Sequence, residues 1–447
     1  ALRKVTGAQN KLETSQRLAG PDADPSLASL GLDSLDAVEW CMEIEARSGV
    51  ELDPADLAVL GSLDDLIRFV AGRLGQTTHA DDTPEIVRVP RDRPLDLSFA
   101  QEVIWGYSQS PKTCAAYALG MMDRILGPLD GLVLRSCLDD IVRRHEILRT
   151  TFASADGRPV QVVHAAESLV LPVMQLSPGA DPEKTAAQFV AAEMARFVDL
   201  HRRPLMRFML IRVNANEHWL LRIGHHILWD EWSTKILMGE IASLYQAKLE
   251  GKGSPFPEGE PLQYADYAAW QRQTLRTDRP AFREAIAWWK EYYEPGAQPS
   301  DLPFKRPEAR TGVDPADGIF SRIVDPELAK RVARLSEEKG ATVYTVWLAA
   351  FAALLARETA RRDVVVGSYM TNRRRPQLQH MLGCFSNLAT LRFRCDFAQP
   401  FGLWLSEVRS NVLAVEARSE IPQELLRKEL EAVGATVPEG RAIFGAP

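Results

Sequence analysis

The chain has 447 residues, 46% hydrophobic and 25% charged, and this size and composition are typical of a globular protein with two or three domains. The formal net charge of −7 argues against a nucleic-acid-binding protein, which usually carries a basic surface. No apolar run approaches the ~18–20 residues that a membrane span needs, and the N-terminus lacks the pattern of a signal peptide. The five cysteines are dispersed without a CxxC pair, which indicates reduced thiols. We therefore expect a cytoplasmic protein without a membrane span, a disulfide frame or a zinc knuckle.

The first 76 residues differ from the rest in charge. They hold 13 acidic and seven basic residues, a net charge of −6, and this asymmetry suggests a separate unit with its own partners. Residues 34–49 and 62–74 show the apolar spacing of helices, with Gly49 as a C-terminal cap and Ser62 as an N-terminal cap. The segment 1–76 is therefore predicted to be a small all-α bundle.

The next stretch, residues 77–94, is polar, contains three prolines and lacks helical periodicity. Because a residue before proline avoids the α region, this stretch is predicted to be a partly extended linker between domains.

From residue 95 onward, strand and helix patterns alternate. The strands predicted from β-branched and aromatic runs cover residues 159–165, 208–214, 218–228, 319–325 and 363–370. The helices predicted from apolar periodicity cover residues 233–251, 326–340 and 342–360, and a helix that runs into a strand covers 131–152. Such a mixture indicates an α/β or α+β protein. The Pro/Gly-rich stretch 252–261 marks the predicted divide between an N-terminal lobe, 95–261, and a C-terminal lobe, 262–447.

Ser34 in "GLDSLDAVEW" is expected at the start of a helix, after a Gly/Asp turn. Amide groups and the helix dipole there favour a phosphate ester, although a serine at such a place is more often a simple cap. "LASLGLDSLDAVEW" and "IEARSGVEL", within residues 25–72, resemble the acyl or peptidyl carrier family, whose signature is Asp-Ser-Leu in this turn. The resemblance implies that Ser34 carries a 4′-phosphopantetheine arm, attached by a phosphopantetheinyl transferase.

Two adjacent histidines, His225 and His226, lie near the end of the predicted strand 218–228, and Asp230 follows them. Neighbouring residues of a strand point to opposite faces, so the pair cannot easily hold one metal ion. HExxH spacing is absent and no further Cys or His lies close in sequence, so no metal site is predicted. One histidine is expected to face a cavity while the other packs inward, with Asp230 holding the local structure. Plain core packing is the alternative.

"HHILWDEWS" resembles the HHxxxDGxS motif of the condensation domains of nonribosomal peptide synthetases, which belong to the chloramphenicol acetyltransferase-like superfamily. Further segments resemble that family's motifs in the family's order: "LSFAQEVIW" at 97–105, "RRHEILRTTF" at 143–152, "YADYAAWQR" at 264–272, "SYMTNRRRPQLQHMLGCFSNLATLR" at 368–392 and, more weakly, "SEIPQELL" at 419–426. An ordered series of this length is hard to obtain by chance. Arg144, Glu146 and Arg149 of the second segment are interpreted as a staple between a helix and a strand.

The resemblance implies a small all-α carrier bundle followed by an α/β, two-lobed condensation domain, whose histidine motif lies in a tunnel that two carrier arms enter. His226 is implied to be the catalytic histidine where the acceptor amine meets the donor thioester. It would act as a base, or it would orient the amine and stabilise the intermediate. His225, in the same motif, is implied to be structural. Asp230 is implied to shape the loop through a salt bridge, with Arg373 as the candidate partner.

Two departures from the family pattern bear on function. Glu231 occupies the place of the motif glycine, which would leave space and allow a positive φ. Three outcomes stay open: Glu231 points away, it binds a cationic acceptor, or it impairs the reaction, and retained activity is the preferred interpretation. Only residues 231–447 follow Asp230, fewer than the family normally has, and the closing RDxSRNPLF-like motif is absent. The C-terminal lobe is therefore expected to be truncated.

The expected function is that of a peptide synthetase fragment in secondary-metabolite biosynthesis. An acyl or peptidyl thioester on the carrier is the donor, a downstream aminoacyl carrier supplies the attacking amine, and adjacent synthetase modules are partners. Two alternatives remain: an ester-forming or otherwise modified condensation domain, and a non-catalytic docking platform that recruits trans-acting enzymes to the carrier. The DxxxxD pattern of a cyclisation domain and the C-terminal motifs of an epimerisation domain are absent from the sequence.

Overall fold

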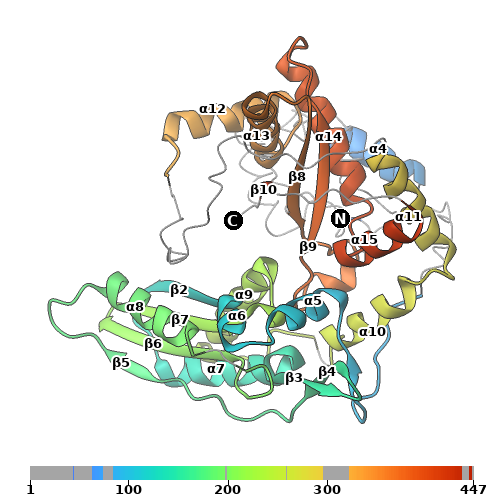
Figure 1. Ribbon diagram of the computed structural model, residues 1–447. Coiled ribbons are helices and arrows are strands. Elements are labelled where there is room, and N and C mark those ends of the chain that lie inside the picture. The colour runs from blue at the N-terminus through green and yellow to red at the C-terminus, as the bar shows by residue number, and fades with distance from the viewer. Residues whose placement is uncertain are drawn as a thin grey trace. The chain divides into compact units, whose positions relative to one another are not determined.

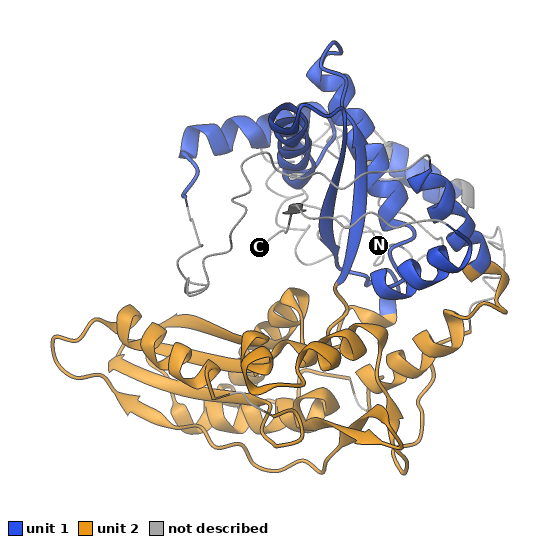
Figure 2. Ribbon diagram, viewed as in Figure 1, with its two compact units in different colours: residues 1–82, 283–376, 387–447 blue, residues 83–282, 377–386 orange. Residues whose placement is uncertain are grey.

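The computed structural model describes residue 44 and residues 63–73, 84–196, 199–257, 259–294, 322–434 and 442–444. Two compact units divide the chain, and each is described by itself (Figure 2). The histidine unit comprises residues 83–282 and 377–386. The second unit comprises residues 1–82, 283–376 and 387–447. The domain boundaries expected from the sequence stay predictions.

The histidine unit is built around a four-stranded sheet of strand order β2-β7-β6-β5 (Figure 1). Its strands are β2 (Ala118–Leu126), β5 (Val173–Gln175), β6 (Met206–Asn214) and β7 (Glu217–His225). β7 is antiparallel to both β2 and β6, and β6 is parallel to β5. As a central strand covered on both faces, β7 has buried residues without a break from Leu220 to His225.

Helices cover both faces of this sheet. The helices of the unit are α5 (Phe99–Tyr107), α6 (Pro111–Ala116), α7 (Gly131–Arg144), α8 (Pro182–Met194), α9 (Glu231–Leu249) and α10 (Tyr264–Thr274), with the short 3-10 turns η3 (Glu146–Arg149) and η4 (His226–Leu228). On one face, a Cβ at Gly120 would lie 2.0 Å from Val190 of α8, so the glycine lets α8 lie directly on β2. On the other face, Met121 contacts Thr234 of α9.

Helix α7 shows how sequence spacing places a helix on this core. Asp130 caps its first turn by accepting from the amides of Leu132 and Val133. Its apolar positions recur at helical spacing and are buried at Leu134, Cys137, Leu138, Ile141 and Val142. The helix therefore presents one apolar stripe to the core.

A second, three-stranded sheet of order β1-β4-β3 completes the histidine unit. Its strands are β1 (Leu95–Asp96), β3 (Thr150–Ala155) and β4 (Arg158–Val163), and both pairs are antiparallel. β3 and β4 form a hairpin whose two turn residues, Asp156 and Gly157, have φ of 50° and 75°. Positive φ at both positions is typical of a two-residue turn that matches the twist of the strands.

The described end of the predicted linker is fastened to the histidine unit. Ile86 is buried, Trp270 Nε1 of α10 donates to the carbonyl of Pro84, and the amide of Val89 donates to Asp266 Oδ1 at 2.9 Å. Residues 84–90 have no regular secondary structure. This part of the chain is therefore held against the histidine unit at Pro84, Ile86 and Val89.

The second unit holds a sheet of order β10-β8-β9, with β8 antiparallel to β9 and parallel to β10. Its elements are α4 (Leu63–Arg73), α11 (Pro280–Tyr293, from residue 283), α12 (Pro326–Glu338), α13 (Val343–Thr359), β8 (Asp363–Met370), β9 (Asn387–Arg394), α14 (Phe401–Glu416), α15 (Gln423–Ala432) and β10 (Ala442–Phe444), with the 3-10 turn η6 (Pro376–Leu378) leading out of it. Trp404 of α14 donates to the carbonyl of Ala349 in α13. Tyr293 of α11 donates to the carbonyl of Thr390 in β9.

Among the described helices, none by itself has the length and apolar composition of a membrane span. Only α12 and α13 taken together meet those two criteria, and a bend of 104° separates them.

The predicted mixed α/β architecture is confirmed, and β4, β6, β7, β8, α9, α12 and α13 lie close to their predicted ranges. Helix α4 agrees with the helix expected at 62–74, whereas the helix expected at 34–49 lies outside the described residues apart from Ile44. The strand expected at 319–325 is wrong in its described part. Residues 322–325 form no strand, Ile323 is 94% exposed, and Asp325 instead caps α12.

Candidate active site

Strand β7 ends between the two histidines. His225 is the last residue of β7, and His226 opens the 3-10 turn η4 that leads to α9. Gly224 allows this tight arrangement, because a Cβ there would lie 2.8 Å from Met206 Sδ and 3.2 Å from the Trp229 ring. The histidines therefore differ in surroundings because the chain changes from strand to turn, and not only because strand residues alternate.

His225 is fully buried beside α5 and α6. Its Nδ1 accepts from the amide of Ile227 at 3.3 Å, and its Nε2 lies 3.4 Å from Ser108 Oγ. The ring centroid is 6.1 Å from that of Tyr117. Burial lowers the pKa of the His225 imidazole to about 4, so the ring is neutral near neutral pH.

His226 has a different environment. Between Leu220 and Asp230 it is the one residue that is not buried. Its amide donates to the carbonyl of Tyr117 at 2.8 Å, and its ring Nδ1 lies 3.7 Å from Cys384 Sγ. No described residue hydrogen-bonds to the other ring nitrogen, Nε2. Tyr117 and Cys384 therefore hold the histidine at its amide and at Nδ1, and Nε2 has no hydrogen-bond partner among the described residues.

Asp230 is buried and caps α9. Its Oδ1 accepts from the amide of Ser233 at 2.9 Å and lies 2.7 Å from Ser233 Oγ. Its Oδ2 accepts from the amide of Phe385 at 3.0 Å. One carboxylate thus joins the start of α9 to the segment 377–386, which comes from far along the sequence.

The same segment is held at the two residues before Phe385. The amide of Gly383 donates to Ser233 Oγ at 3.1 Å, and the hydroxyl of Tyr264 donates to the carbonyl of Cys384. A Cβ at Gly383 would lie 1.7 Å from the Tyr264 ring, so only glycine lets the segment pass so close to it. We call Asp230, Ser233 and Tyr264 the clamp.

The clamp extends to the first motif of the condensation series. Tyr264 is buried, and burial raises the pKa of its phenol well above the ordinary value, so the hydroxyl stays protonated and can donate. Ser98 Oγ lies 2.8 Å from Tyr264 OH and accepts from the amide of Gln101. Because Tyr264 donates to Cys384, Ser98 is the donor to Tyr264. Segments 97–105, 224–233, 264–272 and 377–386 are thus tied together.

Glu231 is the first residue of α9 and is exposed. Its φ is not positive, so its backbone conformation does not require glycine, and no described residue forms a hydrogen bond or ion pair with its side chain. A carboxylate in the first turn also interacts favourably with the helix dipole.

Arg373 is buried and belongs to the second unit, and its predicted ion pair with Asp230 stays a prediction. Ser34 lies outside the described residues. In the described part of the chain, no group of three or more His, Cys, Asp or Glu residues is arranged to hold a metal ion.

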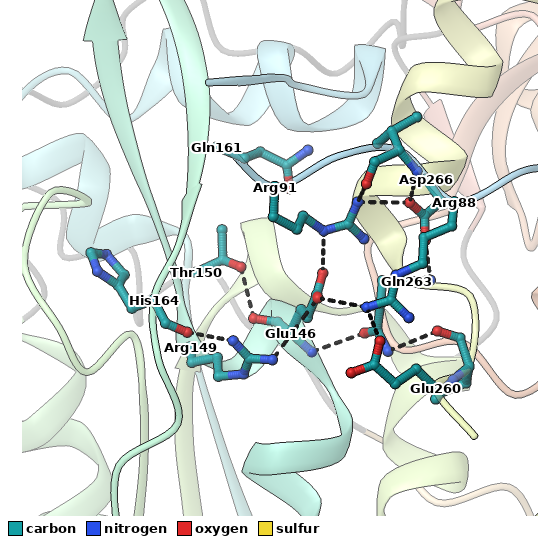
Figure 3. Close-up of polar contacts among 12 residues, drawn as sticks. Arg88, Arg91, Glu146, Arg149, Thr150, Gln161, His164, Glu260, Gln263 and Asp266 are labelled. Carbon is teal, nitrogen blue, oxygen red and sulfur yellow. Dashed lines mark hydrogen bonds and ion pairs between the residues drawn. The ribbon is translucent and has the colours of Figure 1, made fainter. Parts of the chain in front are cut away.

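A second polar cluster surrounds Glu146 (Figure 3). The Glu146 carboxylate lies 2.7 Å from Arg91 Nε, 3.7 Å from Arg88 Nη2 and 3.9 Å from Arg149 Nη2. Arg91 also pairs with Asp266 at 2.8 Å. Burial opposes the charge of Arg91, but its hydrogen bonds to Asp266 and Glu146 outweigh burial and raise its pKa.

This Glu146 cluster fastens separate segments to one another. Arg91 comes from the end of the predicted linker, Glu146 and Arg149 from η3, and Asp266 from α10. Arg149 also donates to the carbonyl of His164, just after β4. The contacts of Arg149 with Glu146 and with the end of β4 agree with the interpreted staple between a helix and a strand, and the cluster adds the linker end and α10. Arg144 does not take part in this staple and pairs with Glu240 of α9 at 3.4 Å.

Three residues of the site were not singled out from the sequence: Tyr264, Cys384 and Ser98. Each lies inside a motif that resembles the condensation family, so the motifs themselves were the available signal. Their partners could not be predicted, because the hydrogen bonds join segments more than 100 residues apart.

Comparison with protein families gives two matches. Residues 93–437 match the condensation domain family, and residues 10–70 match the phosphopantetheine attachment site.

Similar proteins include malpibaldin synthetase of Mortierella alpina, which is 32% identical over 372 residues, covering 82% of this chain and 7% of that protein. Phosphinothricin tripeptide synthetase PhsC of Streptomyces viridochromogenes is 35% identical over 352 residues, covering 77% of this chain and 32% of that protein. The chain spans about a third or less of the length of these relatives.

Among solved structures, the first condensation domain of the calcium-dependent antibiotic synthetase, in complex with a substrate analogue, superposes with a TM-score of 0.66 at 24% identity, covering 79% of each chain. The X-domain from teicoplanin biosynthesis, solved in complex with OxyB, superposes with a TM-score of 0.63 at 26% identity, covering 80% of this chain and 77% of that chain. At 24% identity, the similarity to the condensation domain of the calcium-dependent antibiotic synthetase is evidence for the fold alone.

Proposed function

Because the chain belongs to the condensation-domain family, and a phosphopantetheine attachment domain precedes that domain, we propose that it forms an amide bond between a carrier-bound donor and a downstream aminoacyl carrier. The observation that carries the proposal is the position of His226. Its backbone and Nδ1 are held by Tyr117 and Cys384, its side chain is not buried, and Nε2 has no hydrogen-bond partner among the described residues. A histidine held in this way is suited to proton transfer with a substrate.

In the proposed reaction, the amine nitrogen of the acceptor attacks the carbonyl carbon of the donor thioester. The new C–N bond gives a tetrahedral intermediate, the former amine loses a proton, and the C–S bond breaks. The departing thiolate takes up one proton. The products are an amide on the acceptor carrier and a thiol on the donor carrier, and a hydroxyl acceptor would give an ester by the same steps.

His226 is the proposed base. Its Nε2 accepts the proton that the amine loses and returns it to the departing thiolate. The competing role is to orient the amine and stabilise the charged intermediate by hydrogen bonding. His225 is neutral and enclosed, and Asp230 joins α9 to the segment 377–386, so we propose supporting roles for both.

Ser34 is the proposed attachment point of the 4′-phosphopantetheine arm. The arm supplies the thiol that carries the donor as a thioester. A phosphopantetheinyl transferase and adjacent synthetase modules are the further partners in this proposal, and the cytoplasm is the proposed location.

A second candidate function is a docking platform that recruits a trans-acting enzyme to the carrier. Two observations favour it: Glu231 stands in place of the motif glycine, and the fold resembles that of an X-domain solved in complex with OxyB. The retained residues His225, His226 and Asp230 favour the catalytic candidate, since docking alone does not need a histidine held as His226 is.

One experiment separates the two candidates. The chain is converted to its holo form, the arm is loaded with an acyl group, an aminoacyl carrier is added, and the masses of both arms are followed. We expect transfer by the native chain and a loss of about 10²–10⁴-fold in rate for His226→Ala, the range for removal of a general base. Because the His226 side chain is not buried, the unfolding midpoint of the His226→Ala variant should stay near that of the native chain.

Two results would contradict the catalytic proposal. One is an absence of transfer by the native chain while Glu231→Gly transfers, because the glutamate would then be what blocks the reaction. The other is an equal rate for the native chain and His226→Ala.

A further inference from the structure

Cys384 is the residue in contact with the ring of the proposed base. Its Sγ lies 3.7 Å from Nδ1 of His226, and the residue is only 2% exposed. Neither the histidine motif nor the expectation of dispersed, reduced thiols assigns it a role.

The position of Cys384 is fixed by its neighbours and not by its own side chain. The amide before it, of Gly383, donates to Ser233 Oγ at 3.1 Å, and the amide after it, of Phe385, donates to Asp230 Oδ2 at 3.0 Å. Its own carbonyl accepts from Tyr264. The backbone is therefore held at three successive residues, and the direction of the sulfur towards His226 follows from this.

The proton on the His226 ring decides what the ring can do. A neutral imidazole carries one N–H, and the other nitrogen has the lone pair. His226 can accept a proton at Nε2 only when the N–H is at Nδ1. An N–H at Nδ1 faces Cys384, and a donor turned inward needs an acceptor because leaving it without one costs free energy.

We propose that Cys384 is a positioning residue whose sulfur accepts the Nδ1–H of His226 and so leaves the Nε2 lone pair for the acceptor amine. The proposal rests on the proposed function, because the lone pair matters for catalysis only when His226 is the base. A thiol sulfur is a weak acceptor. Its contribution is therefore direction: it keeps one tautomer and one ring orientation in place.

The first test is spectroscopic and does not require turnover. The full chain is labelled with ¹⁵N in the histidine rings, and the His226 signals are assigned by their absence in His226→Ala. We expect an N–H at Nδ1 and a lone pair at Nε2 in the native chain. Cys384→Ala should shift the tautomer towards Nε2–H, and Cys384→Ser, whose hydroxyl can also accept, should keep the native pattern.

The second test is kinetic. Cys384→Ala should lower kcat by about 10- to 100-fold, as expected when a reacting group loses its orientation, and should leave KM within about twofold. Cys384→Ser should recover most of the rate. The matched control is Cys137→Ala, which removes a fully buried thiol from α7 of the same unit and should leave the His226 tautomer and kcat near their native values.

Three results would overturn the proposal. The first is a native His226 with its proton at Nε2. The second is a Cys384→Ala protein whose His226 tautomer and kcat equal those of Cys137→Ala. If Cys384→Ala does not fold, the equivalent result is a Cys384→Ser protein whose His226 carries its proton at Nε2. The third is an acyl group found by mass spectrometry on Cys384 after loading, which would make it a nucleophile. A native chain that transfers nothing but shows the expected tautomers would refute the proposed function and leave the Cys384 contact standing.

Discussion

Two histidine-containing turns of the same unit are held in different ways. The first turn follows α7, where His145 Nε2 lies 2.6 Å from a Glu240 carboxylate oxygen and Glu146 pairs with Arg91 at 2.7 Å. The second follows β7, where His225 accepts from a backbone amide and Asp230 accepts from the amides of two separate segments. Ion pairs between charged side chains hold the first turn, whereas hydrogen bonds from backbone amides hold the second.

The difference matches what each turn has to do. The first turn, which includes η3, is joined to the linker end and to α10 by ion pairs. Such pairs stabilise the turn as long as every charge keeps its partner. The second turn carries His226, the proposed base. His225 beside it is neutral near neutral pH, so it places no positive charge next to the proposed base.

The largest expected effect comes from breaking the first turn. Glu146→Ala leaves three guanidinium groups without this carboxylate, and we expect the free energy of unfolding to fall by about 3–5 kcal/mol, the range for removing one partner of a buried pair. Glu167→Ala is the matched control, because it breaks an exposed pair with Arg203 in the same unit and should cost no more than about 1 kcal/mol. Equal denaturant midpoints for the two variants would show that the cluster does not fasten the turn.

A smaller effect is expected at His225, and it depends on pH. Its pKa is about 4 in the folded chain and near 6.5 in an unfolded one, so the unfolded state binds more protons between these values. The contribution of neutral His225 to the free energy of unfolding is therefore fully present above pH 6.5 and is lost as the pH falls towards 4. The loss attributable to this residue should reach about 2 kcal/mol by pH 5.

The measurement is the free energy of unfolding at pH 7.5 and at pH 5 for the native chain and for His225→Gln, which cannot titrate. We expect the native chain to lose more stability than the variant over this interval. The same loss in both proteins would mean that His225 is not enclosed as the structure shows.

The two turns also differ in how far they could be predicted from sequence. The roles expected for His225 and His226 rest on a short motif and on the end of a strand, both of which are local. The partners of Asp230 and Glu146 could not be found in this way, because Phe385 and Arg91 lie 155 and 55 residues away along the chain. Strand β2 is not predicted because Gly120, Asp123 and Arg124 interrupt its apolar pattern, although it forms one edge of the sheet and pairs with β7 along its whole length.

Breaking the second turn at Asp230 should have a more modest effect on stability. Asp230→Asn keeps one oxygen acceptor but replaces the other with an NH₂ donor, so either the Ser233 or the Phe385 amide loses its partner. We expect a loss of about 1–2 kcal/mol in the free energy of unfolding, the usual range for a helix cap and one charge-assisted hydrogen bond. Faster amide hydrogen exchange at Phe385 in the variant would locate the loss. Unchanged exchange there would mean that Asp230 does not hold the segment 377–386.

The smallest effect is expected at Glu231, next to Asp230. It is exposed, its backbone is helical, and it has no hydrogen bond or ion pair with a described residue. Glu231→Gly removes a favourable charge from the first turn of α9 and introduces a poor helix former, so stability should fall by up to about 1 kcal/mol. Glu231→Gln removes only the charge and should fall less. Because the Glu231 side chain has no hydrogen bond or ion pair with His226 or with a clamp residue, kcat should stay within about twofold of the native value. An increase of tenfold or more in Glu231→Gly alone would mean that the space left by the motif glycine is needed by the substrate.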